Sequence, residues 1–252
     1  MGAGAMLGTR SRKVLGFRTV LACALSLSLS VAYGMFNPAS VTAATTCVGS
    51  RSNWFVGYWT VGVNTTGSSA IISTEYPSLC AGASTFSNSW SMITSLNAGA
   101  GWAQTGYIRE TQHLNGTMSS FSQYLRTTGD TPVTKWFGGP SSNSIHSYQS
   151  WLSGTTIVMW IDANHVDTTN FNPVNYWGPQ PWSSQFFEET GHCQTDVAGL
   201  PSDKVHFTQV KIRQGASFVA SPSLTSPKPD CGTKYGQSKI NATTLDVRTA
   251  VP

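Results

Sequence analysis

The chain has 252 residues, of which 15 are Lys or Arg and 11 are Asp or Glu, so its formal charge is +4. Four of the basic residues and none of the acidic ones precede residue 44; taking 4 from 15 leaves 11 of each sign, and the chain beyond that point is neutral. A neutral chain has no basic surface for nucleic acid or an anionic membrane, and we exclude both as partners. The length is sufficient for one domain with a substantial core.

The first predicted element is a secretory signal peptide. An apolar run broken only by small serines, Val20–Val31, follows four basic residues: Arg10, Arg12, Lys13 and Arg18. This run is too short and too rich in serine to span a bilayer, and small-residue cleavage sites lie at Ala43 and Ala44. We therefore expect residues 1–43 to be removed and the mature protein to be secreted; a retained anchor helix is the alternative.

The rest of the chain reads as a series of short β-strands. Ten segments rich in aromatic and β-branched residues are separated by Gly, Ser, Asn and Pro clusters. In chain order they are Trp54–Val63, Ala70–Tyr76, Ser89–Leu96, Trp102–Arg109, Ser119–Arg126, Val133–Phe137, Ser147–Leu152, Thr156–Ile161, Gln185–Thr190 and Val205–Ile212. Residues 44–252 are thus predicted to form a single all-β domain, an antiparallel β-sandwich of jelly-roll or concanavalin-like lectin type, with a closed barrel as the competing architecture. The tail from about residue 215 is expected to be extended.

Four cysteines remain after the leader: Cys47, Cys80, Cys193 and Cys231. An even number in an oxidising compartment favours two disulfides over free thiols, and no CxxC spacing indicates a metal site. Cys47–Cys80 and Cys193–Cys231 are the favoured pairs because each closes a moderate loop. The sequence leaves all three connectivities open.

Two of the predicted strands carry polar groups among aromatic neighbours. In Gly101–Glu110, strict alternation places Gln104 on the same face as Trp102 and Ile108. In the later strand, Glu189 shares a face with Gln185 and Phe187, while Glu188 points to the opposite face. One of the two glutamates is therefore expected on the inner or concave side of its sheet.

These two strands carry a resemblance to a known family. Ala103–Gly106, followed 84 residues after its glutamine by Glu188, resembles the glutamic peptidases of the eqolisin type, and Phe86–Met92 resembles the strand with a Ser/Ala-Trp pair that precedes the family's glutamine. The family's Trp-Tyr-Glu-Trp strand has no counterpart, since Phe121–Tyr124 stands in its place. The chain also resembles a group of secreted actinobacterial proteins through Trp102–Tyr107 and Glu189–Gly199, a resemblance that implies no particular activity.

The eqolisin resemblance implies Gln104, Glu188 and Glu189 as catalytic candidates. A glutamate with a raised pKa would act as general base to a water molecule, and the Gln104 amide would stabilise the oxyanion, without a cofactor. The alternative is that Gln104 and the inward glutamate only satisfy each other and nearby backbone groups in a polar patch.

Aromatic residues indicate a second possible activity. Tyr176, Trp177 and Trp182 lie in a loop kept out of regular structure by Gly and Pro, and together with Trp102 they are candidate substrate-binding residues. Such rings stack on sugars or on apolar peptide side chains. The alternative is that they cap one end of the core.

The loop containing Asp162, Asn164 and Asp167 is a weak calcium candidate, since calcium takes six to eight oxygen ligands. It lacks the glycine and closing glutamate of an EF-hand, and an ordinary Asx-turn loop is the alternative. The five histidines show no metal-binding spacing, and no GxSxG elbow marks a serine nucleophile.

Two hypotheses of different class follow. The protein is either a glutamic-peptidase-like hydrolase or a non-catalytic carbohydrate-binding domain of lectin type, and its partner is an extracellular peptide or glycan. A monomer is expected.

Overall fold

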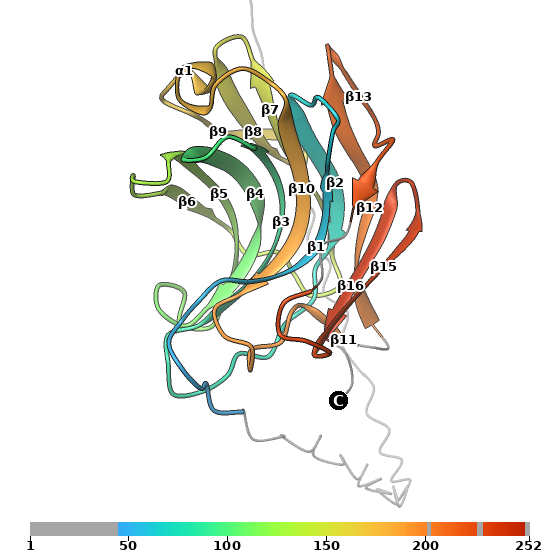
Figure 1. Ribbon diagram of the computed structural model, residues 1–252. Coiled ribbons are helices and arrows are strands. Elements are labelled where there is room, and N and C mark those ends of the chain that lie inside the picture. Colours follow the sequence, from blue (N-terminus) through green and yellow to red (C-terminus); the bar gives the residue numbers. More distant parts are fainter. Residues whose placement is uncertain (1–44, 201–202, 226–228, 250–252) are drawn as a thin grey trace, which may run out of the picture. The chain divides into compact units, whose positions relative to one another are not determined.

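The computed structural model describes residues 45–200, 203–225 and 229–249; the predicted signal peptide lies outside them. The described chain forms two antiparallel β-sheets packed face to face (Figure 1). The predicted β-sandwich is confirmed, and all ten predicted strands are present; Val133–Phe137 and Thr156–Ile161 have the predicted bounds, and the other eight have shifted ends. Within the described ranges, no helix is long and apolar enough to cross a membrane.

The first sheet has seven strands in the order β14-β1-β10-β3-β4-β5-β6. Their bounds, in that order, are Leu224–Thr225, Trp54–Thr60, Trp182–Thr190, Phe86–Ser95, Ala100–Glu110, Met118–Thr127 and Val133–Phe137. β10, β3 and β4 bend along their length in Figure 1, which makes one face of this sheet concave.

The second sheet runs in the order β15-β16-β12-β2-β7-β8-β9, and β11 and β13 also pair with β12. The bounds of these nine strands are Tyr235–Asn241, Thr244–Thr249, Asp203–Gln214, Gly67–Ser73, Ile145–Ser153, Thr156–Ile161, Asn164–Thr168, Gly199–Leu200 and Ser217–Ala220.

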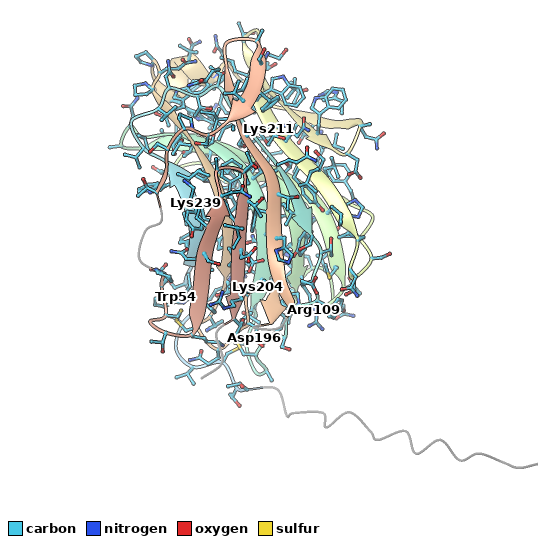
Figure 2. All side chains as sticks on the ribbon, turned by 90° about the vertical axis from the view of Figure 1, so that its right-hand side faces the viewer. Trp54, Arg109, Asp196, Lys204, Lys211 and Lys239 are labelled. Atoms are coloured by element: carbon cyan, nitrogen blue, oxygen red, sulfur yellow. A yellow bond between two sulfur atoms is a disulfide. The ribbon has the colours of Figure 1, made fainter. Side chains whose placement is uncertain are left out.

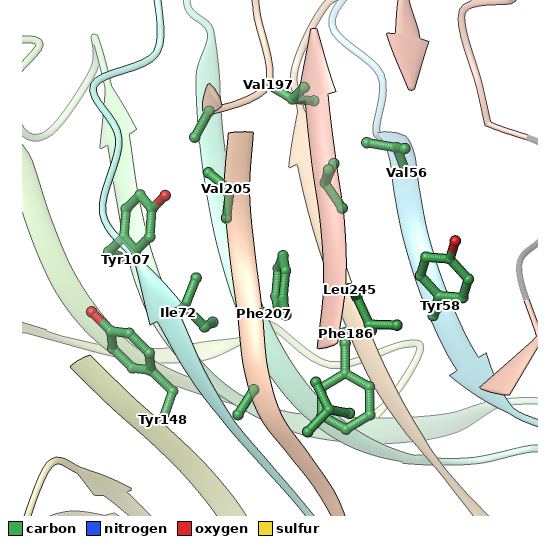
Figure 3. Packing of buried hydrophobic residues seen from close by; sticks show 14 of the residues in the cluster. Val56, Tyr58, Ile72, Tyr107, Tyr148, Phe186, Val197, Val205, Phe207 and Leu245 are labelled. Atoms are coloured by element: carbon green, nitrogen blue, oxygen red, sulfur yellow. The ribbon is translucent and has the colours of Figure 1, made fainter. Parts of the chain in front are cut away.

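The core lies between the two sheets. One cluster packs Tyr58 and Phe186 of the first sheet with Ile72, Phe207 and Leu245 of the second (Figure 3). A second cluster joins residues of both sheets to the segment that leads into β10: Ile93, Ala103, Tyr124, Ile157, Met159, Phe171, Trp177 and Trp182. Burial of each large apolar side chain contributes roughly 1.5–3 kcal/mol to folding.

The tail beyond residue 215 is more regular than expected. β15 and β16 form a hairpin at the edge of the second sheet, and the buried Leu245 and Val247 of β16 join the core between the sheets. One short helix, α1 (Pro173–Trp177), was not predicted. Its five residues are too few to show a helical period; Asn172 caps it by accepting a hydrogen bond from the backbone N–H of Val174.

Both favoured disulfides, Cys47–Cys80 and Cys193–Cys231, are confirmed. Their Cα atoms lie 5.1 and 5.6 Å apart, respectively, within the usual range for bridged cysteines.

The outer faces of the sheets differ in character. Lys204 and Lys211 of β12 and Lys239 of β15 are spread over the second sheet in Figure 2. The outer face of the first sheet instead carries a third apolar cluster: Phe86, Trp90, Met92, Ile108, Phe121 and Phe187. Its members are buried although no second sheet covers them, which indicates a hollow lined by apolar side chains, as is typical of ligand sites.

Candidate active site on the concave sheet

A pocket of about 690 Å³ lies on this outer face of the first sheet. Side chains from six neighbouring strands line it, because residues that are paired across antiparallel strands point to the same side. The strand register arranges these side chains in three rows that run across the sheet.

The carboxylate row consists of Phe55, Glu189, Asn88 and Ile108, on β1, β10, β3 and β4. The aromatic row, one step along, consists of Phe187, Trp90, Gly106, Phe121 and Trp136. The amide row, one step further, consists of Trp59, Gln185, Met92, Gln104, Gln123 and Thr134. The pocket therefore has a carboxylate end and an amide end, separated by aromatic rings.

Gly106 interrupts the aromatic row for a steric reason. A Cβ atom at this position would lie 2.1 Å from the carbonyl oxygen of Ser89, so no other residue fits without moving β3. Beside it, the rings of Trp90 and Phe187 stack with their centroids 5.4 Å apart.

Glu189 is a buried carboxyl group at the edge of this pocket. It is 7% exposed and accepts hydrogen bonds from Trp90 Nε1 at 3.3 Å and from Asn88 Nδ2 at 3.4 Å. Burial raises its pKa to about 7, against the opposing effects of the Asn88 and Trp90 hydrogen bonds and the charge of Arg51. A carboxyl group that changes protonation near neutral pH is suited to proton transfer.

Glu188, its neighbour in sequence, points between the sheets. It is fully buried and accepts a hydrogen bond from Ser89 Oγ at 2.6 Å, and burial raises its pKa well above the ordinary value. Of the two glutamate candidates, therefore, only Glu189 lines the pocket.

Gln104 lines the pocket at the opposite end from Glu189. Its Nε2 donates to Gln123 Oε1 at 2.9 Å, and Gln123 Nε2 donates to Thr134 Oγ1 at 2.7 Å. Gln104 is aligned with Gln185, four residues before Glu189, across the intervening β3. That offset is about 14 Å along the strands and about 10 Å across them. Both sequence-based interpretations, in which Gln104 acts beside the glutamate base or hydrogen-bonds the inward glutamate, need the two side chains to be close, and this separation shows that they are not.

The amide next to Glu189 is that of Asn88, which the sequence analysis missed. Asn88 is 5% exposed, and its Oδ1 has no hydrogen-bond partner among the described residues. Its alternation with Phe86, Trp90 and Met92 was visible in the sequence. Its position beside Glu189 depends on the register between β3 and β10, which the sequence does not show.

The prediction that Trp177 and Trp182 bind substrate is wrong, because both are completely buried in the core. Their indole N–H groups donate to the carbonyl oxygens of Arg126 and Gly178. Tyr176 is 45% exposed, and the Arg126 guanidinium lies over its ring at 5.1 Å. Of the four aromatic candidates, Trp102 lines the pocket.

The calcium candidates contact separate protein groups. Asp162 accepts a hydrogen bond from the backbone N–H of Ser147 at 3.0 Å, and Asp167 pairs with Lys135 Nζ at 2.5 Å. Asn164 is the first residue of β9. No group of three or more His, Cys, Asp or Glu suited to a metal occurs within residues 45–200, 203–225 and 229–249. Calcium binding by this loop stays a prediction.

A Ser-His-Asp arrangement lies at the start of β7. Ser144 Oγ is 2.9 Å from His146 Nε2, and His146 Nδ1 is 3.0 Å from Asp162 Oδ2. However, Ser144 Oγ also donates to the carbonyl oxygen of Ser141, and the backbone N–H groups of Asn143 and Ser144 are engaged in turn hydrogen bonds. Without free amides beside the serine to stabilise an oxyanion, we assign this arrangement a structural role.

The fold and the pocket together define a β-sandwich with a buried carboxyl group, Glu189, on its concave sheet. No protein-family model matches the sequence, and no curated protein matches it. Among solved structures, scytalido-glutamic peptidase with a peptide-based transition-state analogue is similar at 15% identity and a TM-score of 0.57, covering 79% of this chain and 100% of that one. SCP-B, a member of the eqolisin family of peptidases in complex with the tripeptide Ala-Ile-His, is similar at 14% identity and a TM-score of 0.56, with the same coverage.

A family 16 endo-glucanase from Bacteroides ovatus reaches a TM-score of 0.38 at 11% identity, covering 57% of this chain and 70% of its own. The likeness to scytalido-glutamic peptidase and SCP-B shows that the chain shares the fold of the eqolisin-type glutamic peptidases. At these identities the likeness establishes the fold alone.

Proposed function

We propose that this protein is an extracellular peptidase that cleaves peptide bonds in the concave pocket, with Glu189 as the general base. The observation that carries the proposal is the Glu189 carboxyl group, buried at the pocket edge with its pKa raised to about 7. Structural carboxylates are ordinarily ion-paired, as Asp167 is with Lys135. A pocket carboxyl group whose ionised form is destabilised by burial is typical of acid–base catalysis.

In the proposed reaction, ionised Glu189 removes a proton from a water molecule, whose oxygen adds to the carbonyl carbon of the peptide bond. The group beside Glu189 that is available to stabilise the oxyanion is the Asn88 amide, whose Nδ2 carries two hydrogens and donates one of them to Glu189. The single N–H of Trp90 is donated to Glu189 and holds that carboxyl group in place. Gln104, at the other end of the pocket, binds the substrate chain in this proposal instead of assisting the chemistry.

The choice of a peptide as substrate is supported by the fold. Two of the similar structures hold a peptide-based transition-state analogue and a tripeptide. The pocket fits this substrate class, since its amide row offers hydrogen bonds to a peptide backbone and its aromatic row offers an apolar surface to side chains.

The test is cleavage of an unfolded protein substrate between pH 3 and pH 9. Because the base must be ionised, kcat/KM should rise with pH through about 7. Glu189→Gln should lose about 10²–10⁴-fold in kcat, the usual contribution of an acid–base group. The matched control is Glu188→Gln on the opposite face of the same strand, which should retain activity. A fully active Glu189→Gln variant, or a wild type that cleaves no peptide, would overturn the proposal.

A second candidate function, glycan binding, is favoured by one observation. Four tryptophans line the pocket, Trp59, Trp90, Trp102 and Trp136, and Trp136 is 40% exposed. Adsorption to insoluble polysaccharides should then fall in Trp136→Ala with no change in folding. Adsorption together with the absence of any peptide cleavage would establish this function in place of the first.

A further inference from the structure

At the carboxylate end of the pocket, the end of β4 carries a carboxyl–imidazole pair, Glu110 and His113. Glu110, the last residue of β4, is 4% exposed, and its Oε1 lies 2.6 Å from His113 Nδ1 and accepts the backbone N–H of His113 at 3.1 Å. Both residues line the pocket. The His113 side chain is 61% exposed, and its ring lies within 28° of parallel to that of Trp136.

This contact determines which nitrogen of the His113 ring is free to transfer a proton to or from a bound molecule. A carboxylate that accepts Nδ1–H holds the imidazole in one orientation, which leaves Nε2 to exchange a proton with a bound molecule. The backbone hydrogen bond from His113 to the same oxygen makes Glu110 a rigid support. An exposed imidazole held by a buried carboxylate is the arrangement of an acid–base residue and its positioning residue.

The pair lies near Glu189. Glu110 is two residues beyond Ile108, which shares the row of Glu189. The separation between Glu110 and Glu189 is thus about 7 Å along the strands and about 10 Å across two of them. The His113 ring lies beside that of Trp136 on β6, with the two centroids 6.4 Å apart, so a peptide chain bound across the sheet from β10 to β6 passes first Glu189 and then His113.

We infer that His113 is the general acid of the reaction and that Glu110 is its positioning residue, an inference that rests on the proposed peptidase function. Glu189 takes a proton from water, and the water oxygen bonds to the carbonyl carbon. As the C–N bond breaks, the imidazolium Nε2–H of His113 gives its proton to the leaving nitrogen, which departs as a neutral amine. Glu189 then releases its proton to solvent and His113 takes one up, so protons and charge balance.

The experiment compares two leaving groups. An amine must be protonated to leave, whereas p-nitrophenolate leaves as a stable anion and needs no acid. His113→Gln should therefore lose about 100-fold or more in kcat on a peptide and less than about 3-fold on a p-nitrophenyl ester of the same acyl group, given the usual 10²–10⁴-fold contribution of an acid. Glu110→Gln should show the same selective loss in smaller measure, and Glu189→Gln should lose both activities.

His165→Gln is the matched control, since His165 is an exposed histidine of β9 outside the pocket lining; both of its rates should be unchanged. Equal losses on both substrates in His113→Gln, or no loss on either, would overturn this inference while the peptidase function stands. A wild-type protein that cleaves neither substrate would overturn both.

Discussion

Glu188 and Glu189 are adjacent in the chain, but their side chains lie on opposite faces of the first sheet. Strand alternation sends the first between the sheets and the second to the pocket. Burial raises the pKa of both carboxyl groups. At the scale of single residues, ionisation of either group in the folded protein therefore lowers the free energy of unfolding. A destabilising group of this kind is retained where it serves a function.

The cost of Glu189 predicts a specific dependence of stability on pH. Its pKa is about 7 in the folded chain against an ordinary 4.5, so the unfolded state loses its proton first. Below pH 4.5 the carboxyl group is protonated in both states and has no effect; as pH rises to 7, the free energy of unfolding falls by roughly 3 kcal/mol and then levels off.

Glu189→Gln removes this titration. Its melting temperature should equal that of the wild type near pH 4 and exceed it by about 10 °C at pH 8, given about 2–4 °C per kcal/mol for a domain of this size. Calorimetry at both pH values measures the difference. Parallel pH profiles for the two proteins would show that the folded-state pKa of Glu189 is ordinary.

Substitutions of Glu188 should change the stability differently from those of Glu189. Burial raises the pKa of its carboxyl group well above the ordinary value, so the folded protein favours the protonated form more than the unfolded chain does. An amide has nearly the same shape as a protonated carboxyl group, so Glu188→Gln should keep the melting temperature at pH 7 or raise it. Glu188→Ala should lower it by an amount typical of a buried cavity, about 2–4 kcal/mol, and leave Ser89 Oγ without its acceptor. A Gln variant as unstable as the Ala variant would contradict this account.

At the scale of elements, the C-terminal hairpin completes the second sheet. Leu245 of β16 is fully buried, whereas Ile240 of β15, on the same hairpin, is 58% exposed. Leu245→Ala should cost about 2–5 kcal/mol of stability, and Ile240→Ala less than about 0.5 kcal/mol. Urea denaturation measures both. Equal effects would mean that the hairpin is not docked on the core.

The Cys193–Cys231 disulfide links this hairpin to the end of β10. Asp230, next to this disulfide, lines the pocket. Its carboxylate accepts a hydrogen bond from the backbone N–H of Phe55 on β1, and its own backbone N–H donates to the carbonyl oxygen of Phe55. Replacing both cysteines by serine should cost roughly 3–4 kcal/mol for a loop of 38 residues and should loosen this wall of the pocket.

The same replacement at Cys47 and Cys80, which close a loop of 33 residues, is the matched control. It should cost a similar amount of stability but leave the KM for peptide unchanged. In the unmodified protein, thiol labelling under denaturing, non-reducing conditions should find no free thiol in the mature chain.

At the scale of the whole molecule, the proposed function uses one of the two outer faces. The lysine-bearing face of the second sheet (Figure 2) contrasts with the aromatic, carboxyl-bearing face of the first. The sandwich provides the rigid support that acid–base geometry requires, because the strands that carry Glu189, Asn88 and Glu110 are central in the first sheet.

Export of the whole molecule is a prediction from the leader. Protein recovered from a culture supernatant should have an intact mass that lacks residues 1–43. A mass that includes the leader would contradict the signal-peptide interpretation.

The amino-acid sequence by itself determined the fold class, the ten main strands, the presence of two disulfides and the faces of β4 and β10. All of these depend on local alternation, turn residues and the number of cysteines. The connectivity of the disulfides was decided by the tertiary structure. The tertiary structure alone decided that Asn88 and not Gln104 lies beside Glu189, since register results from pairing between strands far apart in the sequence. It also decided that Trp177 and Trp182 are core while Trp136 faces the pocket, because an aromatic side chain is buried or exposed according to which sheet packs over it.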